Sequence, residues 1–75
     1  MKIHIEYCIQ WNYGPEFDRV SNEIKKLHSN AVISGNEVSP RSGAFEITLN
    51  DNLIYSKFKT TTFPTKEELK QLLND

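Results

Sequence analysis

The sequence predicts one α/β domain, an α+β sandwich with the order β-α-β-β-β-α, in which helices pack on a four-stranded mixed sheet. Three observations predict it: two segments in which polar and apolar residues alternate, an amphipathic stripe after the first of them, and a capping box near the C-terminus. The length of 75 residues leaves room for a single domain, residues 1–75. With 37% hydrophobic and 25% charged residues, the chain is too apolar for a disordered segment and too polar for a membrane span.

The first two predicted elements are a strand and a helix. Residues 2–7 alternate polar with apolar side chains and include two isoleucines, which is typical of a strand. Beyond Pro15, apolar residues recur three, seven and ten positions after Phe17, and they form the stripe of an amphipathic helix that ends at about Ser29. Pro15 suits a first helical turn, because the N–H group that proline lacks has no helical partner there.

Three more strands are predicted downstream. The apolar run at 31–33 predicts the second strand, and the alternation over 44–49 predicts the third. Residues 53–58 return as the fourth strand, because the preceding Asn-Asp-Asn favours a tight hairpin turn. That turn pairs the last two strands antiparallel, whereas the helix between the first two indicates a right-handed parallel crossover. We expect the first strand, with its two isoleucines, at a central position in the sheet.

The last helix has the clearest start in the sequence. Thr65, followed three residues later by Glu68, forms a capping box. Leu69, Leu72 and Leu73 supply the apolar face of the helix that follows. Asp75 opposes the helix dipole at its C-terminal end, so we expect the last turn to fray.

Composition limits the classes of function. Nine basic and ten acidic residues give a net charge of −1, so no electrostatic reason favours nucleic acid or a membrane surface as a partner. The single cysteine excludes an internal disulfide and a multi-cysteine zinc site, and we expect no metal. The N-terminus has no apolar signal region and no apolar run reaches about 18 residues, so we expect a cytoplasmic protein with a reduced thiol.

Cys8 is the residue best placed for chemistry. It lies where the carboxyl end of the first predicted strand meets the amino end of the first helix. Unpaired backbone N–H groups at a helix start carry partial positive charge, which favours a thiolate and therefore a reactive sulfur. The alternative is that Cys8 is a small buried hydrophobic residue, which is the more common role of a lone cysteine.

Four segments also carry a resemblance to a known family. They are Ile5-Glu6-Tyr7-Cys8, Asn12-Tyr13-Gly14-Pro15, Ser42-Gly43-Ala44-Phe45-Glu46-Ile47 and Leu53-Ile54-Tyr55-Ser56-Lys57. Their order and spacing, over essentially the whole chain, resemble the selenoprotein W-like family of thioredoxin-fold proteins, also called the Rdx family. The resemblance implies a thioredoxin-like fold, a role in thiol redox control and 14-3-3 proteins as partners.

The chain departs from this family at one position. The family places a second cysteine or a selenocysteine three residues after the first, and here that position holds Trp11. Dithiol chemistry needs this second sulfur or selenium to resolve a mixed disulfide, so the chain is not a dithiol reductase in this form. One-thiol chemistry remains, in which Cys8 reacts reversibly with glutathione or with the thiol of a partner protein. No tightly bound cofactor is expected.

Two other interpretations stay open. One is a non-catalytic interaction domain that binds partners through the Cys8–Tyr13 loop, where two aromatic side chains offer contact area. The other is a natural selenocysteine-containing oxidoreductase represented here with Trp11, since the codons UGA and UGG differ by one base. Drift to a bulky loop residue explains Trp11 equally well, and Trp11 and Tyr13 can also simply cover the top of a small core.

The resemblance further implies one wall of the site. Other thioredoxin-fold proteins place a cis-proline just before the third strand, facing the redox cysteine. The segment Ser42-Gly43-Ala44 takes that place here, and Pro40 is too early to serve. Gly43 would let its backbone approach the cysteine loop closely, although an ordinary turn glycine is the alternative. We expect the backbone of Ser42, Gly43, Ala44 and Phe45 to form one wall of a groove beside Cys8.

Overall fold

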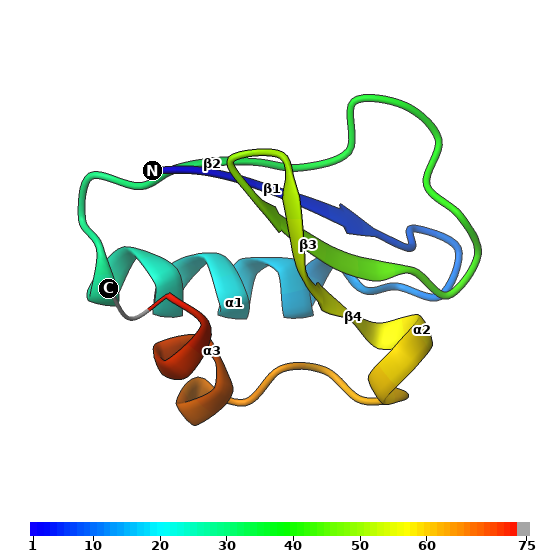
Figure 1. The fold of residues 1–75 in the computed structure, drawn as a ribbon. Coiled ribbons are helices and arrows are strands. Elements are labelled where there is room, and N and C mark those ends of the chain that lie inside the picture. Colours follow the sequence, from blue (N-terminus) through cyan, green and yellow to red (C-terminus); the bar gives the residue numbers. More distant parts are fainter. Residues whose placement is uncertain (74–75) are drawn as a thin grey trace.

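The computed structural model describes residues 1–73 (Figure 1). Its elements, in chain order, are β1 (Lys2–Tyr7), α1 (Gly14–Leu27), β2 (Val32–Ser34), β3 (Phe45–Leu49), β4 (Asn52–Ser56), α2 (Lys57–Thr60) and α3 (Lys66–Leu72). Within these residues, no helix is both long and apolar enough to cross a membrane. The predicted fraying at Asp75 lies outside the described part of the chain.

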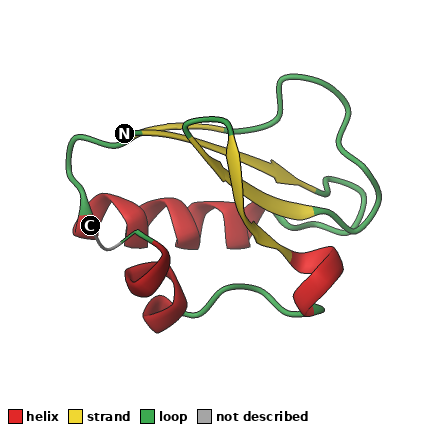
Figure 2. Ribbon diagram, viewed as in Figure 1, coloured by secondary structure: helices red, strands yellow, loops and turns green. Residues whose placement is uncertain are grey.

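The four strands form one mixed sheet in the order β2-β1-β3-β4. The central strand β1 pairs parallel with β2 and antiparallel with β3, and β3 pairs antiparallel with β4. The predicted crossover, hairpin and central first strand are therefore confirmed. Helices α1 and α3 cover one face of the sheet, and the segment 35–44 between β2 and β3 rises away from them (Figure 2).

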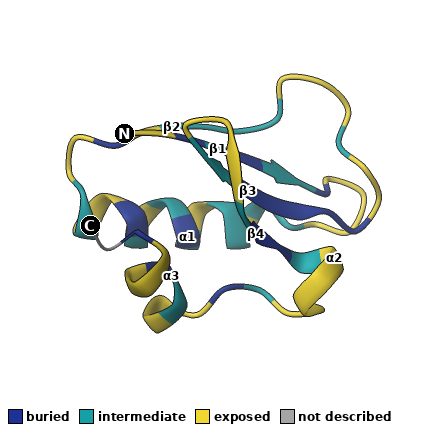
Figure 3. Cartoon of the chain, in the orientation of Figure 1, coloured by how far each residue is buried: buried dark blue, intermediate teal, exposed yellow. Residues whose placement is uncertain are grey.

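The core lies between the sheet and the two longer helices (Figure 3). Alternation along β1 turns Ile3 and Ile5 into this core and leaves His4 and Glu6 on the opposite face. The largest fully buried core side chains come from β1, β3, α1, α3 and the C-cap of α3, namely Ile3, Ile5, Phe45, Ile47, Val20, Ile24, Leu69 and Leu73. Leu72, which was predicted on the same apolar face of α3, is instead 37% exposed. Each contributes about 1.5–3 kcal/mol by leaving water. One face of the sheet is thus fully used for packing, and the other is free.

The hairpin between β3 and β4 has the predicted left-handed turn. Asn50 and Asp51 have φ angles of 48° and 73°, which Asn and Asp tolerate better than other non-glycine residues. The side-chain oxygen of Asn50 accepts the N–H of Lys2 at 3.0 Å, which ties the turn to the start of β1. The capping box of α3 is also present, because the Thr65 and Glu68 side chains each accept the other residue's backbone N–H.

Two predicted elements end earlier than expected. Helix α1 ends at Leu27, with His28 as its C-cap, rather than at about Ser29. The fourth strand stops at Ser56 rather than at residue 58, and residues 57–60 form the short helix α2. The carboxylate of Glu46 causes the change, because it accepts the Ser56 hydroxyl and also the N–H of Lys57, at 2.8 Å. Thr61 then ends the turn in the left-handed conformation, with φ 65°. These partners lie on another strand, so the local pattern of the sequence does not show them.

Candidate functional site

Backbone hydrogen bonds hold Cys8 at the end of the first strand. The residue follows β1 directly and is 1% exposed. Its N–H donates to the carbonyl of Ala44 at 2.9 Å, and its carbonyl accepts the N–H of Tyr13 at 3.0 Å. The loop 8–13 is therefore tied to the segment before β3 at one end and closed on itself at the other.

A backbone N–H group points at the sulfur. The N–H of Trp11 donates to Cys8 Sγ, with nitrogen and sulfur 3.4 Å apart. This donor belongs to the loop, whereas the sequence predicted donors from the start of the helix, and α1 begins only at Gly14. A donor directed at a sulfur stabilises negative charge that develops there. The loop thus supplies the kind of partner that a leaving or attacking thiolate needs.

The indole of Trp11 lies directly on Gly43. The backbone of Gly43 is in the left-handed region, with φ +75°, and a Cβ atom added there would lie 2.8 Å from Cζ3 of Trp11. The hydroxyl of Ser42 adds a hydrogen bond to Oε1 of Gln10, at 3.3 Å. The predicted close approach of this segment to the Cys8 loop is therefore present, and it needs a glycine for two separate reasons.

A row of aromatic rings continues from Trp11 into the core. Trp11 meets Tyr13 edge-on with 6.2 Å between ring centroids, Tyr13 meets Phe63 at 4.8 Å, and Phe63 meets Phe45 at 5.3 Å. The ammonium of Lys57 lies 5.5 Å from the Tyr13 centroid and 5.3 Å from that of Phe63. The row of rings supports the cysteine loop, and the Lys57 ammonium places a positive charge beside the rings of Tyr13 and Phe63.

Comparison with known protein families shows which family the chain belongs to. The sequence model of the Rdx family matches residues 2–75. The chain belongs to the Rdx family. The resemblance found in the sequence is thereby confirmed.

Similar proteins agree with this assignment. A selenoprotein W-related protein from Vibrio cholerae is 29% identical, has a TM-score of 0.82, and the match covers 99% of this chain and 92% of that one. A structure from Bordetella parapertussis, 22% identical with a TM-score of 0.84 over 99% of this chain and 94% of its own, shows the same fold. A thioredoxin reductase-like selenoprotein T homolog from Drosophila melanogaster is 53% identical over 34 residues, which is 45% of this chain and 17% of that protein.

The structure brings the predicted site residues of this Rdx domain together, with different roles. Ala44 and Phe45 are fully buried, so they contribute backbone and support rather than reachable side chains. Sequence reasoning missed two residues of this site, Phe63 and Lys57. Both are distant from Cys8 in the sequence, and the fold brings them against Tyr13. Phe63 lies next to Pro64, between α2 and α3, where no local pattern of the sequence indicates its position.

The described part of the chain offers no metal centre at the thiol. Residues 1–73 contain no group of three His, Cys, Asp or Glu side chains able to hold a metal ion. Two hollows of about 350 and 430 Å³ lie on the free face of the sheet, and Cys8 lines neither of them. Neither hollow is therefore the groove that the sequence predicts beside Cys8.

Proposed function

We propose that this Rdx domain is a one-thiol redox module, in which Cys8 exchanges with glutathione disulfide or with a disulfide of a partner protein. The observation that carries the proposal is the N–H group of Trp11 on the Cys8 sulfur, within a loop fastened to Ala44. The membership in a redox-associated family supports it. The position of Trp11 excludes an internal disulfide, so the mixed disulfide is the end product until an external thiol reverses it.

The proposed step exchanges one sulfur–sulfur bond for another. The Cys8 thiol loses its proton to water, and its thiolate attacks one sulfur of glutathione disulfide. The disulfide bond of that molecule breaks, a bond between Cys8 and glutathione forms, and one glutathione thiolate leaves and takes up a proton. No further oxidant is needed. A protein disulfide reacts in the same way and leaves the partner bound through Cys8.

Movement of the loop has to precede this step, because Cys8 is 1% exposed. The Trp11 ring is 57% exposed and rests on a glycine, so it can leave Gly43 at a modest cost in buried surface. The loop 8–13 is short and ends at α1, whose packed stripe stays in place. We therefore propose local opening of this loop, rather than unfolding of the domain, as the route to the thiol.

A second candidate is a non-catalytic interaction domain. The specific observation in its favour is that Ile9 and Trp11, two large apolar side chains of the cysteine loop, are 59% and 57% exposed. Exposed aromatic side chains of this kind often dominate a protein interface. In this proposal a cytoplasmic partner, such as a 14-3-3 protein, docks on the loop without any reaction of Cys8.

Intact-mass measurement after incubation with glutathione disulfide tests the redox proposal. We expect the folded protein to gain one glutathionyl group, which dithiothreitol removes, and the Cys8→Ser variant to gain none. A folded protein that gains no adduct until denaturant is added would overturn the redox proposal. If Trp11→Ala then also weakens binding of a 14-3-3 protein, the docking proposal takes its place.

A further inference from the structure

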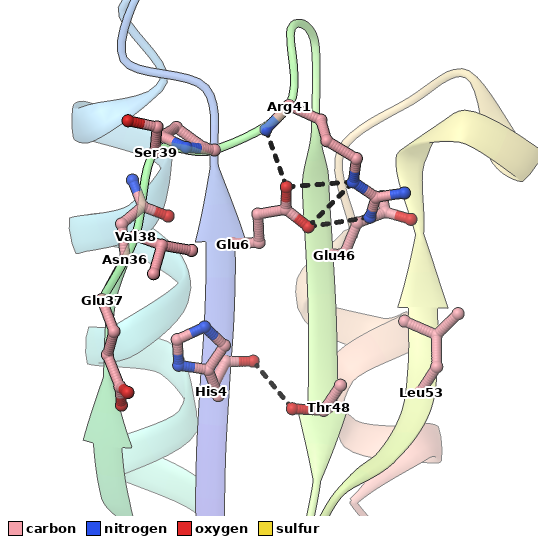
Figure 4. A pocket seen from close by; sticks show the side chains of 11 residues that line it. His4, Glu6, Asn36, Glu37, Val38, Ser39, Arg41, Glu46, Thr48 and Leu53 are labelled. Carbon is pink, nitrogen blue, oxygen red and sulfur yellow. Dashed lines mark hydrogen bonds and ion pairs between the residues drawn. The ribbon is translucent and has the colours of Figure 1, made fainter.

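The free face of the sheet carries a groove that the redox proposal does not use. Its floor is formed by side chains of β1 and β3, which point away from the helices, and its sides by the segment 36–41 and by Leu53 of β4 (Figure 4). The hollow measures about 350 Å³, which is at the small end of sites that bind ligands. It adjoins the second hollow, with which it shares His4, Glu37, Val38 and Thr48, so the two form one groove along β1 and β3.

The first of these hollows is negatively charged. Three carboxylates line it, those of Glu6, Glu37 and Glu46, against the single guanidinium of Arg41, which leaves two negative charges. The second hollow adds one lysine and one further carboxylate, Lys2 and Asp51, so it does not change this balance. A low-dielectric groove lined by one sign of charge attracts a cation.

Two of the carboxylates are fixed in position. Glu46 is buried at the floor and accepts the Ser56 hydroxyl and the N–H of Lys57. Glu6 accepts the guanidinium of Arg41 at 2.7 Å and its backbone N–H at 2.8 Å. The charge on the floor is therefore held in place before any ligand arrives, and little reorganisation is needed on binding.

Glu37, the third carboxylate, differs from Glu6 and Glu46 in its contacts. Within residues 1–73 its carboxylate makes no hydrogen bond or ion pair with the protein, although it lines both hollows. It lies beside His4 at the side of the groove, where an incoming cation can reach it (Figure 4). Glu37 is thus the carboxylate available for a direct ion pair with a ligand.

The walls of the groove are apolar and exposed. Val38 forms one wall and is 80% exposed, and Leu53 forms the opposite wall and is 50% exposed. Side chains of this kind match the methylene stem of an arginine or lysine, which packs on apolar surface while its charged head pairs with a carboxylate. A simple metal cation would not use these walls.

We propose that this groove binds an arginine or lysine side chain of an extended segment of a partner protein. The stem of that side chain lies between Val38 and Leu53, and its head pairs with Glu37 beside His4. The continuation of the groove toward Lys2 and Asp51 accommodates the residues that flank the basic one. The site is separate from Cys8, so it does not depend on the redox proposal.

Titration of ¹⁵N-labelled protein with a blocked tripeptide, acetyl-Val-Arg-Val-amide, tests this inference by NMR. We expect saturable shifts at the amides of His4, Thr48 and Leu53. The matched peptide with neutral citrulline in place of arginine is expected to bind at least about threefold more weakly. Equal binding of the two peptides, no saturable shift, or shifts confined to the cysteine loop would overturn the inference.

Variants sharpen the same test. Glu37→Gln is expected to weaken binding of the arginine peptide about threefold, because it removes one ion pair at an exposed side of the groove. The matched control is Glu67→Gln, which removes one exposed carboxylate from α3 and is expected to leave binding unchanged. Cys8→Ser should also bind the peptide normally. A Glu37→Gln protein that binds like Glu67→Gln would contradict the proposed contact.

Discussion

Replacing Gly43 by alanine tests the contact that closes the cysteine loop. The Cβ atom of alanine would lie 2.8 Å from Cζ3 of Trp11, closer than such contacts allow, and the backbone there has φ +75°. The left-handed conformation costs an alanine about 1–2 kcal/mol. Alanine also restricts the unfolded chain, which returns about 0.4–1 kcal/mol. Because the ring is largely exposed, it can move outward and relieve the clash at the cost of its packing on residue 43.

The balance of these terms predicts that Gly43→Ala lowers the free energy of unfolding by about 1–2 kcal/mol. Urea denaturation followed by far-ultraviolet circular dichroism measures this change. In a Trp11→Ala background the ring contact is already gone, so the same substitution should cost about 0.5 kcal/mol less. Trp11 is the one tryptophan of the chain, so its fluorescence also reports whether the ring has left its place in Gly43→Ala.

Gly14→Ala is the matched control. A Cβ atom at Gly14 has no heavy atom within 4 Å, and this glycine opens α1, where alanine is the better helix former. Its stability should stay the same or rise slightly. A Gly43→Ala protein as stable as the unchanged protein, or a cost that is the same with and without Trp11, would contradict the predicted clash between residue 43 and the ring.

Three further predictions concern the loop, the acid stability and the last helix. Trp11→Cys should form a disulfide with Cys8 in glutathione redox buffer, because the backbone at position 11 already reaches the sulfur at 3.4 Å; mass spectrometry showing only separate adducts would mean that the loop lacks this geometry. The hydrogen bond from Arg41 is the main cause that holds the pKa of Glu6 below its usual 4.5, so the pair stabilises the fold above that pH and this stability is lost as pH falls through the lowered value. Acid titrations should therefore show a steeper loss below pH 4.5 for the unchanged protein than for Glu6→Gln, and identical slopes would contradict the assignment. Thr65→Ala should lower the free energy of unfolding by about 1 kcal/mol in urea, since it removes the capping box of α3; an unchanged midpoint would argue against that cap.

The fold was predictable to the extent that its pattern is local. Alternation in β1 and β3, the stripe of α1 and the capping box of α3 each lie within a short stretch of sequence, and all four elements are present. Helix α2 was missed because its start depends on Glu46, eleven residues before Lys57 and on the neighbouring strand. The sequence pattern after Ser56 predicts that the strand continues. In the structure, the Glu46 carboxylate of β3 accepts the N–H of Lys57, and a helix begins there instead.

The candidate site, like the fold, could be predicted from the sequence only in part. Cys8 and Gly43 stand out in the sequence, one as the lone thiol and the other as a glycine beside a predicted strand. Their connection through the Trp11 ring is a tertiary contact, and so is the support from Phe63. The groove on the free face is harder still to predict, because it combines side chains of two strands with a long loop.

Alkylation by iodoacetamide in increasing, sub-denaturing urea measures whether the Cys8 sulfur becomes accessible while the domain stays folded. If the loop 8–13 opens locally, the alkylation rate of Cys8 should be nearly independent of urea below the unfolding transition, because local opening exposes little surface. If instead the rate rises with urea as steeply as global unfolding does, the thiol is reached only in the unfolded chain, and Cys8 is a core residue rather than a redox centre.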